Sequence, residues 1–174
     1  IREVQGVGSG ADVAASVYGG VIVYQQYAPY ILKRLLFLLP LVVIYSGYKT
    51  PTPEVIKKVE KDHSSYPKIF EALYEAMDEA VSKAILFIEQ EDWPALGRMM
   101  DIQQGVMNAL GVSTPLLNQL VDALKILPDI YGAKISGSGL GDCIIGLGEG
   151  KALPDQLHVS SIPVAVTLQG VSYE

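Results

Sequence analysis

Residues 135–146 read Ile-Ser-Gly-Ser-Gly-Leu-Gly-Asp-Cys-Ile-Ile-Gly, a glycine-rich stretch between two runs that favour β-strands. Glycines at 137, 139 and 141 allow the backbone to approach a ligand closely and expose N–H groups to an anion. A dinucleotide-binding fingerprint would need a helix after the glycines, and a Walker loop would need Gly-Lys-Ser/Thr; neither follows here. A plain glycine-rich hairpin and a hairpin that binds an anion therefore both remain open.

The residues around this stretch alternate between strand-forming and helix-forming patterns. β-Branched and aromatic residues predict strands at 21–24, 39–45, 133–135, 142–147 and 162–168. Apolar residues at three- and four-residue steps predict helices over about 69–90, 96–110 and 114–124, and Thr52-Pro53 predicts an earlier helix start with Thr52 as N-cap. Strands on both sides of a helical block indicate an α+β fold, with an antiparallel or mixed sheet packed with helices.

A second glycine-containing segment lies near the start of the chain. Residues 8–20 read Gly-Ser-Gly-Ala-Asp-Val-Ala-Ala-Ser-Val-Tyr-Gly-Gly, so Asp12 lies where a loop turns into a short helix of small residues. The positive end of a helix favours a carboxylate at that place. A catalytic aspartate and an ordinary helix N-cap both fit this position.

Gln103 lies on the apolar stripe of the helix expected over 96–110. A buried amide without a hydrogen-bond partner costs about 1–3 kcal/mol, so the side chain needs a partner or a cavity. We expect Gln103 to face the substrate cavity or to make a structural hydrogen bond.

The composition limits the class of protein. The chain has 174 residues, of which 49% are hydrophobic and 18% charged, which predicts one globular domain over residues 1–174. The net charge is −6, from 13 Lys and Arg against 19 Asp and Glu, so a nucleic-acid partner is not expected. A single cysteine cannot form an internal disulfide, which indicates a reducing, cytoplasmic location.

Neither a membrane span nor a metal site is expected. Residues 30–44 form the most apolar run, but Lys33, Arg34 and Pro40 interrupt it, and its uncharged part is shorter than the roughly 20 residues that cross a bilayer. A buried strand accounts for this run better. His63 and His158 have no third ligand nearby, so no metal site is predicted.

Together and in this order, the two glycine-containing segments resemble the second and third motifs of the GHMP kinases. This family includes galactokinase, homoserine kinase, mevalonate kinase and phosphomevalonate kinase. The motif segments are Ser-Gly-Ala-Asp-Val-Ala-Ala-Ser-Val-Tyr-Gly-Gly at 9–20 and Lys-Ile-Ser-Gly-Ser-Gly-Leu-Gly-Asp-Cys at 134–143. Residues 100–124, with Leu-Gly-Val-Ser-Thr-Pro at 110–115, look like the corresponding part of mevalonate and phosphomevalonate kinases. The resemblance covers nearly the whole chain.

The resemblance implies that this chain is the C-terminal part of a longer kinase. In the family, a Gly-Leu-Gly-Ser-Ser-Ala-like loop that wraps the phosphates of ATP precedes the second motif, and this chain does not contain it. A chain that begins at Ile1 rather than at methionine agrees with that expectation. The resemblance thus implies a ferredoxin-like domain of the family's C-terminal type, with the ATP-loop domain outside this chain.

The resemblance also implies roles for particular residues. Asp12 falls on the aspartate proposed as the catalytic base in mevalonate kinases. The residues that fall on the loop beside the nucleotide phosphates are Ser136, Gly137, Ser138, Gly139 and Gly141. Ser9, Gly10 and Gln103 are expected to contact the substrate.

The expected activity of the full-length protein is transfer of the γ-phosphoryl group of ATP to mevalonate or phosphomevalonate, with ATP and Mg²⁺ as cofactors. Asp142 stands where mevalonate kinases often have glycine, and Gly-Asp-Cys is more frequent in phosphomevalonate kinases, so both acceptors stay open. The alternatives are a sugar kinase of the same family and a non-catalytic module that binds a small molecule. The expected partners are the small-molecule substrate and a second copy in a homodimer. The chain alone is expected to be inactive.

Overall fold

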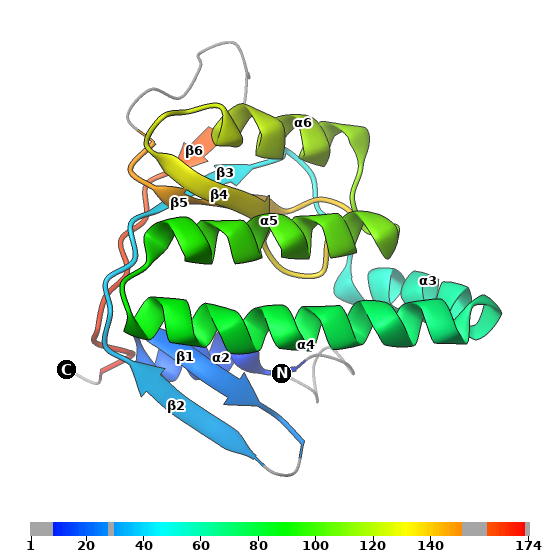
Figure 1. Ribbon diagram of the computed structural model, residues 1–174, viewed down its shortest axis with the longest axis horizontal. Coiled ribbons are helices and arrows are strands. Elements are labelled where there is room, and N and C mark those ends of the chain that lie inside the picture. The colour runs from blue at the N-terminus through cyan, green and yellow to red at the C-terminus, as the bar shows by residue number, and fades with distance from the viewer. Residues whose placement is uncertain (1–8, 28–29, 151–159, 173–174) are drawn as a thin grey trace. The chain divides into compact units, whose positions relative to one another are not determined.

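The computed structural model describes residues 9–27, 30–150 and 160–172 (Figure 1). Its contacts divide the chain into two compact units, residues 1–40 with 165–174, and residues 41–164. Within the described ranges, no helix is both long and apolar enough to cross a membrane. That both units form the single domain expected from the chain length stays a prediction.

The smaller unit consists of a short helix, a β-hairpin and the C-terminal segment. Helix α2 (Ala11–Tyr18) leads through two glycines into strands β1 (Val21–Gln25) and β2 (Ile31–Leu35), which pair antiparallel. Backbone bonds attach the C-terminal segment: the Gly20 N–H donates to the Thr167 carbonyl at 2.6 Å and the Val171 N–H to the Ser16 carbonyl at 2.9 Å. The segment after residue 164 therefore completes the unit that the start of the chain begins.

The apolar run at 30–44 differs from its prediction. It contains two strands, β2 in the smaller unit and β3 (Leu41–Tyr45) in the larger one. Lys33 and Arg34 lie exposed in β2, and Leu35 is the buried residue of that strand. The charges that interrupt the run thus belong to a separate hairpin strand, where they face solvent. A single buried strand could not accommodate these charges.

The larger unit contains a four-stranded antiparallel sheet. Its order is β4 (Ile130–Ile135), β5 (Cys143–Gly148), β3 and β6 (Ser160–Ile162). Ile144 of β5 pairs with Ile44 on one side and with Ile135 on the other. The expected strand at 162–168 is wrong beyond Ile162: Pro163, which has no N–H to donate to a ladder, ends it.

Four helices join these strands: α3 (Thr52–Ser65), α4 (Pro67–Glu89), α5 (Trp93–Ala109) and α6 (Pro115–Lys125). Each has proline in its first turn, where the missing N–H costs no helical bond. The Thr114 hydroxyl accepts the Leu117 N–H at 3.3 Å and caps α6, close to the helix start expected at residue 114. Helix α3 begins at Thr52 itself with Pro51 as N-cap, one residue before the expected position.

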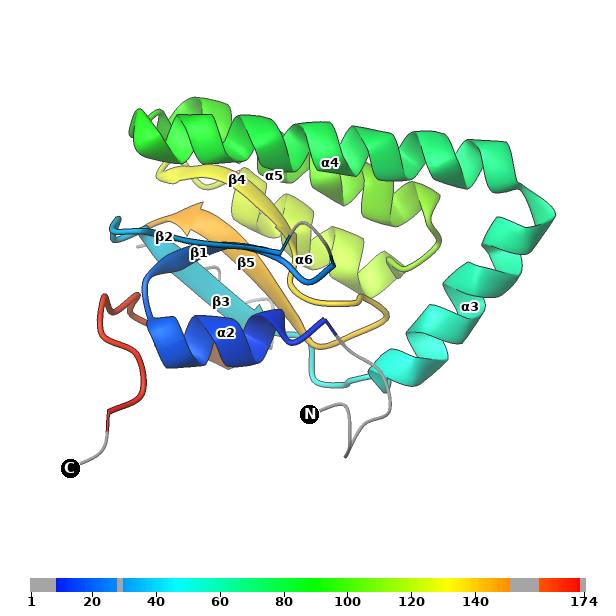
Figure 2. The same ribbon diagram turned by 90° about the horizontal axis from the view of Figure 1, so that it is seen from below.

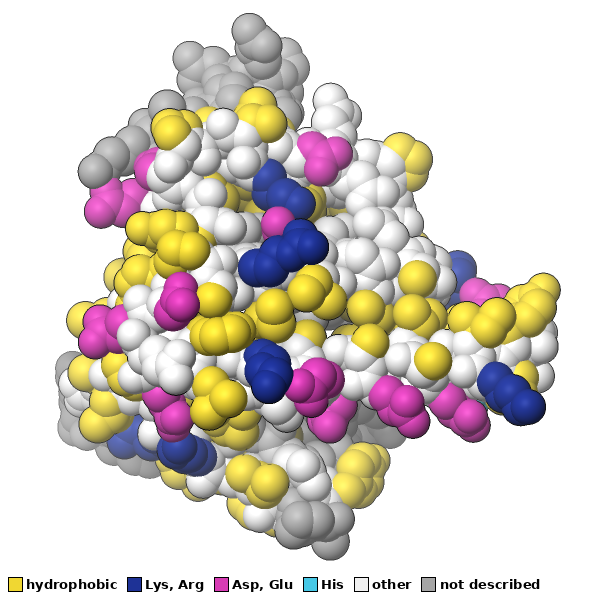
Figure 3. All heavy atoms as spheres, viewed as in Figure 1, with side chains coloured by type: hydrophobic (Ala, Val, Ile, Leu, Met, Phe, Trp, Pro, Cys, Tyr) yellow, Lys and Arg dark blue, Asp and Glu magenta, His cyan; other side chains and the backbone are white. Residues whose placement is uncertain are grey.

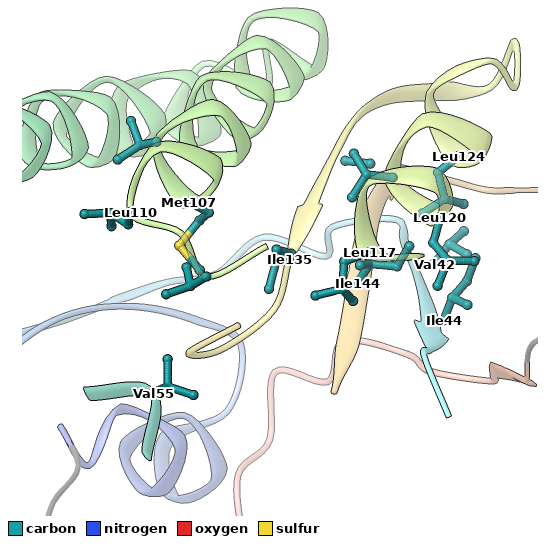
Figure 4. Packing of buried hydrophobic residues seen from close by; sticks show 14 of the residues in the cluster. Val42, Ile44, Val55, Met107, Leu110, Leu117, Leu120, Leu124, Ile135 and Ile144 are labelled. Carbon is teal, nitrogen blue, oxygen red and sulfur yellow. The ribbon is translucent and has the colours of Figure 1, made fainter. Parts of the chain in front are cut away.

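The part of the core that supports the β4–β5 hairpin lies between α6 and one face of the sheet. Figure 4 shows Leu117, Leu120 and Leu124 of α6 against the strand residues Val42, Ile44 and Ile144. These three leucines are at most 1% exposed. Full burial of such a side chain contributes about 1.5–3 kcal/mol, so this interface holds the strands that carry the glycine-rich loop.

Helix α5 covers the outer edge of β4 (Figures 1 and 2). The backbones of the helix and the strand touch at two glycines: a Cβ atom on Gly132 would overlap the backbone of Gly97, and a Cβ atom on Gly97 would overlap the carbonyl of Tyr131. Helix α4 packs beside α5 and turns exposed acidic side chains outward (Figure 3): Glu71, Glu75, Asp78 and Glu79. Some of the acidic residues that make the chain negatively charged thus lie on this surface.

Candidate functional site

The glycine-rich stretch forms the loop of the β4–β5 hairpin, over residues 136–142. The Ser136 N–H donates to the Cys143 carbonyl at 2.9 Å and closes the hairpin. All three glycines have positive φ, and so do Leu140 (54°) and Asp142 (66°). A non-glycine residue in this region costs about 1–3 kcal/mol, so the surrounding structure must hold the loop firmly.

Backbone hydrogen bonds hold both of these non-glycine residues. The Leu140 N–H donates to the Val112 carbonyl at 2.7 Å, and its carbonyl accepts the Thr50 hydroxyl at 2.5 Å. The Asp142 N–H donates to the Tyr48 carbonyl at 2.7 Å. The loop is therefore fixed between the connection that follows β3 and the connection between α5 and α6.

The first half of the loop has the opposite character. The N–H groups of Gly137, Ser138 and Gly139 have no acceptor within the described part of the chain. Gly137 is exposed, Ser138 half-buried and Gly139 buried. Consecutive N–H groups in backbone of this kind form a concave site that suits an anion such as phosphate. Of the two interpretations left by the sequence, this arrangement favours the anion-binding hairpin.

A cavity of about 380 Å³ opens beside Gly137 and Ser138. Its other walls are mostly apolar side chains of α3, α4 and α5, among them Val55, Ile56, Tyr74, Met77, Met107 and Leu110. The loop thus presents its N–H groups at the rim of a mainly apolar space.

Two lysines lie at the ends of the loop in different environments. Lys49 forms an exposed ion pair with Asp142 at 2.6 Å, and that hydrogen bond and charge raise the pKa of Lys49. Lys134, the residue before Ile135, is half-buried, and its ammonium group donates to the Ile135 carbonyl at 2.7 Å. Burial lowers the pKa of Lys134 to about 8, because the charged form loses its hydration.

Asp12 lies in the first turn of α2 but does not cap the helix. The N-cap is Gly10, in the left-handed conformation with φ 78°, and the Ser9 hydroxyl accepts the Ala11 N–H at 3.3 Å. The Ser9 carbonyl also accepts the Tyr24 hydroxyl at 3.0 Å. The interpretation of Asp12 as an ordinary N-cap is therefore wrong. Its exposed carboxylate makes no hydrogen bond that caps the helix. Contact of Ser9 and Gly10 with a substrate stays a prediction.

The buried glutamine of α5 is Gln104 rather than Gln103. Gln103 is half-buried, whereas Gln104 is 5% exposed and lies on the same face as Leu96, Met100 and Met107. In the sequence, Gln104 lies on a helical stripe with these three apolar residues, at steps of four and three. A neighbouring stripe through Met99 and Gln103 fits the helical period equally well. Contact of Gln103 with a substrate stays a prediction.

Other residues of the site carry little signal in the sequence. Thr50 and Val112, whose bonds hold Leu140, lie 90 and 28 residues before it in the chain. Contacts between such distant residues produce no periodic pattern in the sequence. His63 lies in α3 against Phe70 and Tyr74, and His158 lies outside the described residues.

The comparisons with known proteins agree with the family resemblance of the sequence. Residues 69–159 match the family model described as GHMP kinases C terminal. Mevalonate kinase of Pyrococcus furiosus is 38% identical over 154 residues, which cover 85% of this chain and 45% of that protein. Mevalonate kinase of Thermococcus onnurineus is 34% identical over 173 residues, covering 96% of this chain and 48% of that protein.

A solved structure agrees with the fold as well. The crystal structure of L. major mevalonate kinase in complex with R-mevalonate superposes with a TM-score of 0.76 at 29% identity, covering 87% of this chain and 46% of that one. The chain therefore spans about half the length of the relatives it matches. The family match and the α+β architecture with antiparallel sheets lead to one conclusion: the chain belongs to the GHMP kinases and corresponds to their C-terminal part.

Proposed function

We propose that the full-length protein is an ATP-dependent kinase that phosphorylates a hydroxyl group of mevalonate. The observation that carries the proposal is the anchored glycine loop, whose N–H groups at Gly137, Ser138 and Gly139 have no acceptor within the described residues. Mevalonate is supported as acceptor by the relatives named mevalonate kinase, at 34–38% identity. Phosphomevalonate is the second candidate, because Asp142 follows the last glycine of the loop.

The residues of this chain fit part of an ATP site. A triphosphate carries oxygens that accept hydrogen bonds, and the three N–H groups of the loop are donors of fixed direction. Lys134 and Lys49 add positive charge at the two ends of the loop, although Asp142 neutralises part of it. When bound, ATP supplies the phosphoryl group that is transferred.

Preorganised donors matter most in such a transfer. Phosphoryl transfer depends mainly on positioning and electrostatic stabilisation of the transferring group. The bonds of Leu140 to Val112 and of Asp142 to Tyr48 fix the second half of the loop, directly after these N–H groups, before any ligand arrives. The loop therefore loses little conformational freedom when a phosphate binds.

Asp12 takes or orients the proton of the acceptor hydroxyl. As the acceptor oxygen forms its bond to the γ-phosphorus, the bond between that phosphorus and ADP breaks, and the hydroxyl proton passes to the Asp12 carboxylate. Because Asp12 is exposed and does not cap α2, its side chain can turn toward an acceptor without loss of a helix bond. The first turn of α2 also favours negative charge at this position.

Mg²⁺ is part of the proposal through the family alone. Among the described residues, no three His, Cys, Asp or Glu side chains converge on a point that could hold a metal ion. No described residue of this chain is therefore assigned to the ion. A cytoplasmic location, which the single cysteine indicates, and a homodimer also belong to the proposal.

The test is a phosphorylation assay on the full-length protein with Mg·ATP and three acceptors: R-mevalonate, phosphomevalonate and galactose. We expect turnover of R-mevalonate at least tenfold above the other two. A preference for phosphomevalonate would replace the acceptor but keep the kinase. Tight binding of R-mevalonate without turnover would instead support the non-catalytic module.

The 174-residue chain, purified alone, serves as the matched control in the same assay. We expect no measurable turnover from it, because the donors of the ATP-phosphate loop expected in the N-terminal part of the family are not among its residues. ATP-dependent turnover by this chain would contradict the proposed division of the active site between two halves of the protein.

A further inference from the structure

We propose that Gln104 is a positioning residue that sets the conformation of the glycine loop at residues 136–142. This inference rests on the proposed function, because the loop matters to activity only if it binds phosphate. The sequence pattern assigns Gln104 no role of its own, and its side chain does not lie among the residues that line the cavity beside the loop.

The carboxamide of Gln104 is buried and uses both of its ends. Its oxygen accepts the N–H of Ile135 at 2.9 Å. Its nitrogen donates to the Asn118 side-chain oxygen at 3.2 Å and lies 3.4 Å from the Ser113 hydroxyl. The Ser113 hydroxyl in turn donates to the same Asn118 oxygen at 2.8 Å. Gln104 therefore joins the end of β4 to the start of α6 and the connection before it.

Both segments that Gln104 joins lead directly to the loop. Ile135 is the last residue of β4, and the next residue, Ser136, makes the bond that closes the hairpin. Ser113 follows Val112, whose carbonyl accepts the N–H of Leu140 in the middle of the loop. One side chain thus fixes the distance between the loop's entry and its central anchor.

The length of the side chain fits this task. Asp101, three residues earlier on α5, makes the same kind of bond to the Ala133 N–H, at 3.3 Å. Between these two helix positions α5 rises about 4.5 Å, whereas β4 advances about 6.6 Å from Ala133 to Ile135. The two bonds therefore do not repeat with the same offset along the helix, and glutamine has one methylene more than aspartate with which to reach its partner.

Asp101 provides the control for a purely structural role. It lies on the same helix, accepts from the same strand edge and is half-buried, with 16% of its side chain exposed. Its bond lies two strand residues farther from the loop, and its other partner is Lys125 at the end of α6, not the 112–113 connection. Loss of either side chain should weaken the edge of β4, but loss of Gln104 alone should release the loop.

The experiment compares Gln104→Met with Asp101→Leu in the full-length protein, using Mg·ATP and R-mevalonate. Both substitutions keep bulk and remove the acceptor. For Gln104→Met we expect the KM for Mg·ATP to rise about tenfold, the scale of one buried hydrogen bond, with the KM for R-mevalonate within about twofold. For Asp101→Leu we expect both KM values within about twofold. Gln104→Glu keeps an acceptor for Ile135 and should return the KM for Mg·ATP to within about threefold.

Amide hydrogen exchange of residues 137–142 is a second readout that needs no activity. We expect the Leu140 amide to exchange about tenfold faster in Gln104→Met and at the parent rate in Asp101→Leu. If Gln104→Met does not fold, Gln104→Asn, which keeps the amide but is one methylene shorter, should show the same faster exchange.

The outcomes separate the two proposals. Equal loss of melting temperature in both variants, with unchanged exchange at Leu140 in Gln104→Met or Gln104→Asn, would overturn the positioning role. A parent protein without kinase activity would overturn the proposed function, while faster exchange at Leu140 would still support the control of the loop by Gln104.

Discussion

The glycine loop at residues 136–142 and the start of α2 both carry residues proposed for phosphoryl transfer, yet the structure holds them in different ways. The loop is fixed by backbone bonds at Leu140 and Asp142 and accepts positive φ angles at non-glycine residues. Asp12 is exposed, caps nothing and depends only on the direction of its helix. A site that binds through backbone N–H groups needs a rigid backbone, whereas a carboxylate needs only a defined place on a helix.

This difference predicts the largest effect at Asp12, and an effect on chemistry alone. General-base assistance contributes about 10²–10⁴ in rate, so Asp12→Asn in the full-length protein should lower kcat by about that factor. Its melting temperature should stay close to that of the parent, because Asp12 makes no capping bond. Steady-state kinetics with R-mevalonate and thermal unfolding measure both.

Ser16→Ala on the same helix is the control for this experiment. The Ser16 hydroxyl donates to the Asp12 carbonyl at 2.9 Å, so its loss disturbs α2 locally without removing the carboxylate. We expect kcat of Ser16→Ala within about threefold of the parent. A kcat of Asp12→Asn in that same range would exclude Asp12 as the base.

The loop should show the reverse pattern, with stability and binding lost together. Gly139→Ala places a Cβ atom against the Val112 carbonyl and forces alanine to adopt φ 88°. The steric overlap and the backbone strain together should lower the free energy of unfolding by about 2–4 kcal/mol. Gly137→Ala is the matched substitution: φ is 80°, but nothing lies within 4 Å of the added atom, so only about 1 kcal/mol is expected. Urea unfolding of the two full-length variants gives the comparison, and equal losses would mean that contact with Val112 does not fix the loop.

A smaller effect concerns pH and the lysine before the loop. Burial lowers the pKa of Lys134 to about 8 in the folded chain, against 10.5 in the unfolded chain. Between these values the unfolded chain binds more protons, so this group makes the folded state more stable as pH rises from about 8 to 10.5, by about 3 kcal/mol at most.

Lys134→Met isolates this contribution from other groups that titrate at high pH. At pH 7 the variant should be more stable than the parent, and the difference should shrink to near zero above about pH 10.5. Thermal unfolding of both proteins across this range measures it. A difference that does not depend on pH would mean that Lys134 stays hydrated in the folded state.

Much of the larger unit follows from local patterns. Apolar periodicity predicts the helices α4, α5 and α6, and turn and strand signals predict the start of α6 and the β4–β5 hairpin. The order of the two glycine-containing motifs is enough to indicate the family. The helices, the helix start and the hairpin, as well as each motif taken singly, depend on residues close together in the chain, where spacing carries the information.

The errors arise where distant segments decide the outcome. The sequence does not predict strand β2 because Lys33 and Arg34 interrupt an apolar run, although a hairpin strand with one solvent face tolerates both. Periodicity favours Gln103 as readily as Gln104 because two helical stripes fit the sequence, and only the edge of β4 determines which of them is buried. The anchors of the loop at Thr50 and Val112 are equally non-local.

The way α5 lies along β4 also bears on aggregation. β4 is an outer strand of its sheet, and an outer strand normally presents N–H groups to which another extended chain can add. Here Asp101 and Gln104 occupy the N–H groups of Ala133 and Ile135, and the contact between Gly97 and Gly132 leaves no room for a further strand. A second chain could extend the sheet at this edge only after α5 had detached, so the edge is protected for as long as that helix stays folded.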